Sequence, residues 1–147
     1  MDVIVSRHLL EHGGHQRDYL LIRPADIETQ DLPVVMDLHG SGLRPEDQAR
    51  TSNAYATAQA AVVVVPSGLI PFQVRTNLPP ATTWSIPGAP LPGEDEIRPE
   101  VAAIDDVAFV VDLAQSTEPR EVVGFEVILG AYSPLSIAAM GPVSLSG

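Results

Sequence analysis

Residues 33–42, Pro-Val-Val-Met-Asp-Leu-His-Gly-Ser-Gly, constrain the fold of this chain more than any other stretch. Four apolar residues between positions 34 and 38 lie between a proline and a turn with two glycines, a pattern typical of a central strand buried on both faces. Glycine adopts backbone angles that are closed to other residues. We therefore predict that the turn directs backbone N–H groups into the crevice above the sheet, a place to hold a developing negative charge.

A second buried strand is predicted by the run Val-Val-Val-Val at residues 62–65. Residues 44–61 are rich in Ala, Gln and charged side chains, and we predict a helix there that ends near Ala60. Strand 32–38, this helix and strand 62–65 then form a right-handed βαβ unit. This order of elements predicts the α/β fold class.

Two apolar-rich runs near the N-terminus, residues 3–10 and 16–22, flank the glycines at 13 and 14. Glycines between two such runs favour a hairpin turn, so we predict an antiparallel hairpin that leads into the parallel sheet with its flanking helices. We expect the hairpin turn to lie on the far side of the sheet from the glycine turn at 39–42.

The second half of the chain has weaker patterns. Eight of the fourteen prolines fall within residues 66–99, which we predict to be a long loop over the C-terminal edge of the sheet, because long loops in compact domains usually line a binding site. Residues 99–115 have helical spacing. Residues 121–129 predict a strand interrupted by Gly124 and Glu126, and residues 134–147 have no strong pattern.

Composition excludes several classes of function. The 147 residues suffice for one domain, spanning 1–147. A net charge of −11 repels phosphate backbones and anionic lipid, which argues against nucleic acid and membrane partners. The apolar runs are too short to span a bilayer and no secretory leader is present, so we expect a cytoplasmic location for the chain as written. The absence of cysteine excludes disulfides and thiol nucleophiles.

Two groups of side chains raise the question of a metal site. His8, His12 and His15 lie in or beside the predicted hairpin. Histidines around a two-strand turn are more often exposed to solvent, and no carboxylate is placed to complete a site. The segment Gly-Glu-Asp-Glu at 93–96 is most simply a solvated acidic loop rather than a calcium site. We predict neither a metal nor a cofactor.

Five segments, in order and together covering about residues 17–113, resemble the polyhydroxybutyrate depolymerase and feruloyl esterase-like family of the α/β-hydrolase superfamily. They are Arg-Asp-Tyr-Leu-Leu-Ile-Arg-Pro at 17–24, Leu-His-Gly-Ser-Gly at 38–42, Val-Val-Val-Pro-Ser-Gly at 63–68, Thr-Trp-Ser-Ile-Pro-Gly at 83–88 and Asp-Asp-Val-Ala-Phe at 105–109. The resemblance implies hydrolysis of carboxylic esters, such as short polyhydroxyalkanoate oligomers or acyl groups on plant polysaccharides. Relatives of this kind are often secreted.

The resemblance also implies roles for particular residues. The oxyanion hole falls at His39, Gly40, Ser41 and Gly42, with the N–H of Ser41 as the donor. Trp84 lies in the part of the family's loop near the substrate, although an aromatic side chain that plugs the loop against the core is an equal alternative. For the pair at 105 and 106, a helix cap or a hydrogen bond to a neighbouring loop is favoured over catalysis.

The chain departs from the family after about residue 120, and residues 121–147 form an atypical tail. The family continues into Gly-x-Ser-x-Gly, whereas here Glu126 stands where the serine belongs and Ile128 where the second glycine belongs. The weak candidate Ser133 is followed by Pro134, which has no N–H for the second oxyanion contact. No acid or histidine follows in the family's order, because all four histidines precede this region.

Two hypotheses follow. The first is an ester hydrolase domain that is truncated and nearly inert in this chain, with a small ester, polyester or polysaccharide ester as the substrate of its complete relatives. The second is a non-catalytic α/β module whose 67–98 loop binds a ligand or a partner. In either case we expect self-association through an exposed hydrophobic sheet edge.

Overall fold

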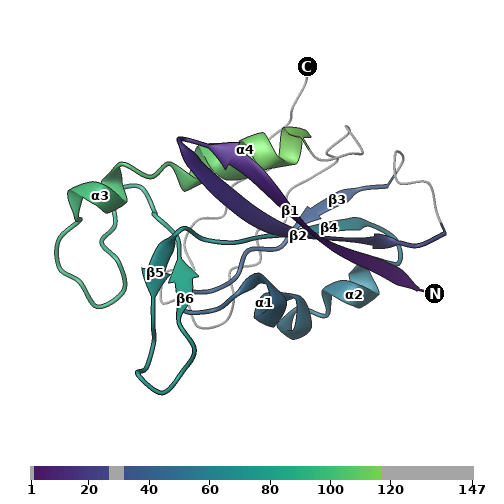
Figure 1. Ribbon diagram of the computed structural model, residues 1–147, viewed down its shortest axis with the longest axis horizontal. Coiled ribbons are helices and arrows are strands. Elements are labelled where there is room, and N and C mark those ends of the chain that lie inside the picture. The colour runs from purple at the N-terminus through teal and green to yellow at the C-terminus, as the bar shows by residue number, and fades with distance from the viewer. Residues whose placement is uncertain (1, 27–31, 117–147) are drawn as a thin grey trace.

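The computed structural model describes residues 2–26 and 32–116, and these form a mixed β-sheet between helical layers (Figure 1). The four-stranded sheet has the order β1-β2-β4-β3. Its strands are β1 (Val3–His12), β2 (His15–Pro24), β3 (Val34–Met36) and β4 (Val62–Pro66). The fold is of the α/β class, with mixed strand directions in one sheet.

The N-terminal hairpin pairs β1 with β2 in antiparallel register from Val3 opposite Pro24 to His12 opposite His15. Gly13 and Gly14 both have positive φ, at 59° and 79°, which the tight connection requires and which glycine adopts without steric cost. β3 and β4 are parallel, with Val34 opposite Val62. The βαβ unit predicted from the sequence is present, and its first strand is shorter than the predicted 32–38.

The sheet is buried on both faces because side chains alternate along β4. Val62 and Val64 pack with Phe109 and Leu113 of α4 (Asp106–Ser116) on one face. Val63 and Val65 pack on the other face with the small residues of α1 (Pro45–Thr51) and α2 (Ala54–Thr57), namely Ala49 and Ala54. Figure 1 shows α4 on one side of the sheet and the α1–α2 pair on the other.

The single helix predicted over residues 44–61 is wrong, because the structure divides it into α1 and α2. Asn53 has a left-handed backbone, with φ 56° and ψ 44°, and asparagine tolerates that conformation better than most residues. The hydroxyl of Ser52 donates to the carbonyl oxygen of Gln48 at 2.9 Å and also to the carboxylate of Asp37. Local side-chain hydrogen bonds of this kind compete with continuation of a helix.

The segment predicted as one long loop, residues 66–99, contains a second sheet. β5 (Ile70–Phe72) and β6 (Ala81–Thr83) pair antiparallel, with Ile70 opposite Thr83. The predicted helix over 99–115 is likewise divided, into α3 (Pro99–Ala102) and α4. Asp105 ends the interruption by accepting a hydrogen bond from the N–H of Ala108 at 2.9 Å, so it caps α4.

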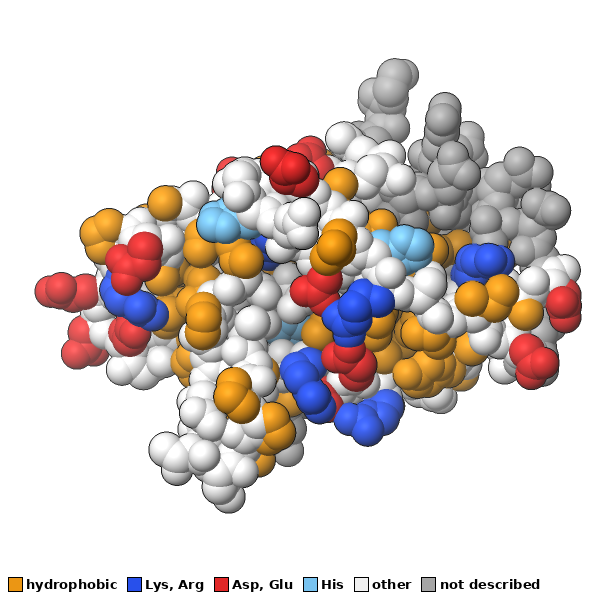
Figure 2. Space-filling view, in the orientation of Figure 1, with side chains coloured by type: hydrophobic (Ala, Val, Ile, Leu, Met, Phe, Trp, Pro, Cys, Tyr) orange, Lys and Arg blue, Asp and Glu red, His pale blue; other side chains and the backbone are white. Residues whose placement is uncertain are grey.

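Charged side chains of both signs mix across the middle of the face in Figure 2. Arg7 of β1 pairs with Asp18 and Glu46, and Asp47 pairs with Arg44 and Arg50. Exposed pairs like these contribute little to stability. No helix within residues 2–26 and 32–116 is long and apolar enough to cross a membrane. The self-association predicted from the sequence stays a prediction.

Candidate active site

The turn at residues 39–42 lies at the carboxyl end of β3, where the sequence predicts it. The N–H of Leu43 donates to the carbonyl oxygen of Gly40 at 3.2 Å and closes the turn. Gly42 has φ 79°, and a Cβ built there would lie 2.2 Å from Cγ2 of Val74. The positive φ therefore favours glycine at position 42, whereas the exposed Val74 side chain could move away from a Cβ there.

Residues 82–84, at and just after the end of β6, contact three of the four residues of this turn. The N–H of Gly42 donates to the carbonyl oxygen of Thr82 at 3.0 Å, and the hydroxyls of Ser41 and Thr83 lie 2.7 Å apart. The indole N–H of Trp84 donates to the carbonyl oxygen of His39 at 2.8 Å. The turn is thus shaped by a strand that the sequence did not predict.

Trp84 packs the loop after β6 against the core. Its ring packs against the core cluster beneath α4 and lies 4.9 Å from the His39 ring, and its only polar atom is used by the His39 carbonyl. These contacts correspond to the structural alternative that the sequence left open. A contact between Trp84 and a substrate stays a prediction.

The backbone donors of residues 40–43 divide into two groups. The N–H groups of Gly42 and Leu43 are engaged within the protein. Those of Gly40 and Ser41 have no acceptor within the described ranges 2–26 and 32–116. Gly40 is buried and Ser41 is half-buried, so the Ser41 N–H is the donor with more access to a ligand. Unused N–H groups held in a fixed turn suit an anionic oxygen, because their dipoles need not reorganise as charge develops.

His39 is a fully buried crosslink between two turns. Its Nε2 accepts a hydrogen bond from the N–H of Gly68 at 2.9 Å, and its Nδ1 donates to the carbonyl oxygen of Gly40 at 2.8 Å. An amide N–H can only donate and a carbonyl can only accept, so these partners require the neutral tautomer with the proton on Nδ1. Both ring nitrogens are occupied, and His39 braces the turn rather than exchanging protons.

Burial lowers the pKa of His39, against the smaller raising effects of the Gly40 hydrogen bond and of the Asp106, Asp18 and Asp47 carboxylates. Below about pH 6.5 the unfolded imidazole takes up a proton that the folded one does not. We therefore expect stability to fall as the pH drops from about 6.5 toward the folded pKa. The contribution of His39 to this slope is at most about 1.4 kcal/mol per pH unit.

Urea unfolding between pH 5 and pH 8 tests this expectation. The variant His39→Gln is less stable at every pH, but its free energy of unfolding falls less steeply with acid than that of the wild type. His8, His12 and His15 are common to both proteins and cancel in the comparison. Parallel pH profiles would show that His39 does not titrate with unfolding.

A buried ion pair beside the turn escaped the sequence analysis. Nη2 of Arg17 lies 2.6 Å from Oδ1 of Asp106, with the two side chains 2% and 5% exposed. Oδ2 of Asp106 accepts the N–H of Ser85 at 2.6 Å, and Cζ of Arg17 lies 3.9 Å from the centre of the Phe109 ring. Asp106 therefore joins α4 to the loop after β6, and the sequence-based preference for a cap or loop bond at 105 and 106 is correct.

A second buried carboxylate lies at the end of β3. Asp37 accepts hydrogen bonds from Nε2 of Gln48 at 2.7 Å and from the hydroxyl of Ser52. Burial raises the pKa of Asp37, and these two hydrogen bonds act in the opposite direction. The contacts fix β3 to α1 on the side away from α4 and hold the residue two positions before His39.

The sequence analysis placed the hairpin and its histidines on the far side of the sheet from the turn at 39–42, and this prediction is wrong. β2 runs antiparallel to β4 with Tyr19 opposite Pro66, so the hairpin turn projects beyond the carboxyl end of β4, the same edge that carries the turn at 39–42. Nε2 of His12 lies 3.0 Å from Oδ2 of Asp112, and the ring of His8 stacks on Tyr19. Within the described ranges no three metal-ligating side chains gather.

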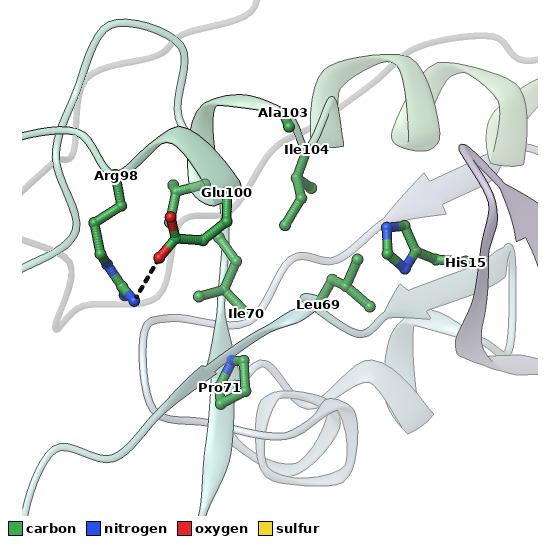
Figure 3. Close-up of a pocket in the computed structure, with 9 residues that line it drawn as sticks. His15, Leu69, Ile70, Pro71, Arg98, Glu100, Ala103 and Ile104 are labelled. Atoms are coloured by element: carbon green, nitrogen blue, oxygen red, sulfur yellow. Dashed lines mark hydrogen bonds and ion pairs between the residues drawn. The ribbon is translucent and has the colours of Figure 1, made fainter.

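An open groove of about 640 Å³ lies next to this edge. Figure 3 shows Leu69, Ile70 and Ile104 between His15 at one end and the Arg98–Glu100 ion pair at the other. Nη1 of Arg98 lies 3.3 Å from Oε1 of Glu100, and its Nε lies 3.1 Å from Oε2 of Glu94 in the acidic loop. The middle of the groove is apolar, and one of its lining residues, Leu69, directly follows Gly68.

Neither a protein-family model nor a curated protein sequence matches this chain. Similar solved structures include an esterase from Rhizomucor miehei, at 22% identity over 52% of this chain and 25% of that chain, with a TM-score of 0.41. A mutant of the esterase rPPE is 25% identical over 44% of this chain and 21% of that chain, with a TM-score of 0.35. Brefeldin A esterase, described as a bacterial homologue of human hormone-sensitive lipase, is 21% identical over 87% of this chain and 31% of that chain, with a TM-score of 0.47.

These structural neighbours are esterases and lipase homologues of the α/β-hydrolase superfamily. The chain spans about a fifth to a third of their lengths. The polyhydroxybutyrate depolymerase family is not among the three. Ser133 and the predicted strand 121–129 lie outside the described residues.

Proposed function

We propose that this chain carries the N-terminal part of a carboxylic-ester hydrolase of the α/β-hydrolase type, with the oxyanion hole in the turn at His39, Gly40, Ser41 and Gly42. One observation carries the proposal. The Ser41 N–H has no acceptor within the described ranges, while residues 82–84 hold Gly42, the Ser41 hydroxyl and the His39 carbonyl by hydrogen bonds. Such preorganisation costs nothing at the moment when charge develops on the ester oxygen.

The attacking group is the part that this chain does not provide in recognisable form. No Gly-x-Ser-x-Gly occurs in the 147 residues. Loss of the nucleophile in a serine hydrolase costs on the order of 10⁶ in turnover, whereas an oxyanion hole and binding alone leave about 10³ over water. We therefore propose that these 147 residues bind the carbonyl oxygen of an ester or the anionic oxygen of its carboxylate product without measurable turnover.

Titration of the ¹⁵N-labelled chain with butyrate tests the oxyanion turn directly. Butyrate carries the negative oxygen of a short-chain ester product, and we expect its largest amide shifts at Ser41 and Gly40. The amides of Gly42 and Leu43 are already bonded within the protein and shift less. Shifts confined to residues away from 39–42 would contradict the proposal.

The absence of turnover is measured with p-nitrophenyl butyrate. We expect release of p-nitrophenol at the rate of an equal concentration of an unrelated acidic protein. Faster release that a serine-directed fluorophosphonate abolishes would show that the chain contains a working nucleophile. Short polyhydroxyalkanoate oligomers and acyl groups on polysaccharides remain the proposed substrate class for complete relatives.

The groove between β5 and α3 favours the second candidate, a non-catalytic binding module. Its volume of about 640 Å³ lies within the usual range for small-molecule sites, and its apolar middle with polar ends is typical of them. The same titration separates the two candidates. Shifts at Leu69 and Ile104 without shifts at Ser41 would favour the binding module.

A further inference from the structure

The hydroxyl of Thr83 has a single partner among the described residues. Its side chain lies in the protein interior, with the residue 2% exposed, and its Oγ1 is 2.7 Å from Oγ of Ser41. This hydroxyl forms no hydrogen bond with any other described group. A buried hydroxyl proton without an acceptor is costly, because the desolvation of that donor is not repaid. Either hydroxyl could be the donor at this distance, and this cost favours Thr83 as the donor and Ser41 as the acceptor.

This direction decides what the Ser41 hydroxyl can do. A serine hydroxyl has one proton and two acceptor lone pairs. If Thr83 donates, the Ser41 oxygen accepts that proton's hydrogen bond through one of its own lone pairs, and the Ser41 proton remains available. Ser41 is half-buried in the turn that follows β3, and its N–H also has no acceptor in the described ranges. One residue then presents two unused donors.

We infer that Ser41 donates both its N–H and its hydroxyl to the anionic oxygen, and that Thr83 is a positioning residue that sets the direction of the hydroxyl. This inference rests on the proposed function. In related hydrolases the second donor is the N–H of the residue after the nucleophile. The sequence contains no Gly-x-Ser-x-Gly turn, so this donor has no recognisable counterpart here. The Ser41 hydroxyl supplies a second donor from residues 32–116.

The opposite polarity makes a different prediction. If Ser41 donates to Thr83, the Ser41 proton is consumed inside the protein and the Thr83 proton is left without an acceptor. Removal of the Thr83 hydroxyl would then free the Ser41 proton and strengthen anion binding. If Thr83 donates, its removal leaves the Ser41 hydroxyl without a fixed direction and weakens anion binding. Thr83→Val therefore distinguishes the two arrangements.

The test measures the dissociation constant of butyrate for six proteins, the wild type and five variants, from the amide shifts of residue 41. In Ser41→Ala the N–H is kept and only the hydroxyl is lost, and we expect binding about tenfold weaker, as for one hydrogen bond to a charged group. In Thr83→Val we expect a smaller loss, and in Thr83→Ser a return to the wild-type value. Ser6→Ala and Thr51→Val make the same chemical changes on β1 and at the end of α1 and leave binding unchanged.

Each outcome bears on the inference. Equal affinity of Ser41→Ala and the wild type overturns the role of the hydroxyl but leaves the proposed function standing. Tighter binding by Thr83→Val overturns the assigned direction. A wild type whose Ser41 amide does not respond to butyrate contradicts the proposed function, and this inference with it. If Thr83→Val does not fold, Ser41→Ala and Thr83→Ser decide the matter.

Discussion

Replacement of Arg17 by methionine is expected to lower the free energy of unfolding by about 3–5 kcal/mol, the usual cost of removing one partner from a buried ion pair. Methionine fills the space of the arginine stem but leaves the carboxylate of Asp106 without its cation. That carboxylate is 5% exposed and, among residues 2–26 and 32–116, keeps only the N–H of Ser85, at 2.6 Å. Packing on the Phe109 ring is reduced as well, because the guanidinium lies over its face.

Urea unfolding followed by circular dichroism measures this change. Arg50→Met is the matched control, because Arg50 pairs with Asp47 on the surface with its side chain 68% exposed, and an exposed pair contributes about 1 kcal/mol or less. The double variant Arg17→Met with Asp106→Asn should recover much of the loss, since it removes the unpaired buried charge and the asparagine Oδ1 can still accept from the N–H of Ser85. If Arg17→Met costs no more than Arg50→Met, the pair is not buried in solution.

Replacement of Gly68 by alanine is expected to cost about 2–3 kcal/mol, within the range for an atom forced into a packed interior. The added Cβ would lie 2.4 Å from the carbonyl oxygen of Thr83 and 2.9 Å from its carbonyl carbon. Both atoms belong to the backbone of β6, so no side chain can rotate to make room. The strand that shapes the turn must move.

The same substitution should disturb the turn at 39–42 at a distance. The N–H of Gly68 donates to Nε2 of His39, and Thr83 contacts Ser41, so a shift between Gly68 and Thr83 lengthens both contacts. We expect amide shifts at Gly40 and Ser41 together with the loss of stability. Ser67→Ala changes the neighbouring residue without adding an atom and serves as the control. A stability within about 0.5 kcal/mol of the wild type would contradict the close approach.

Several elements were predictable because their signals are local. The alternating and continuous apolar runs identified the hairpin, β3 and β4, and the glycine turn followed from residues next to one another in the chain. The helix breaks were not predictable from composition. The helix breaks at Asn53, which adopts a left-handed conformation, and the preceding Ser52 binds Asp37. Asp37 lies sixteen positions before Asn53, so no local sequence pattern predicts this contact.

The candidate site shows the same division. Its turn and Trp84 were visible in the sequence, whereas Arg17 was recognised only as part of a strand. Arg17 and Asp106 lie 89 positions apart, and nothing in either neighbourhood marks them as partners. The available signal for this ion pair was the presence of a charged residue, Arg17, in a strand of mixed composition. It does not tell a buried ion pair from an exposed one.

The amino-acid sequence by itself determined the α/β class, the βαβ unit and the place of a glycine turn at the end of a buried strand, because backbone preference and apolar periodicity act over a few neighbouring residues. Only the tertiary structure decided which donors of that turn are free. That depends on Thr82, Thr83 and Trp84, which the pairing of β5 with β6 brings against the turn from forty positions away. Hydrogen-bond partners are set by proximity in space, which chain order does not encode locally.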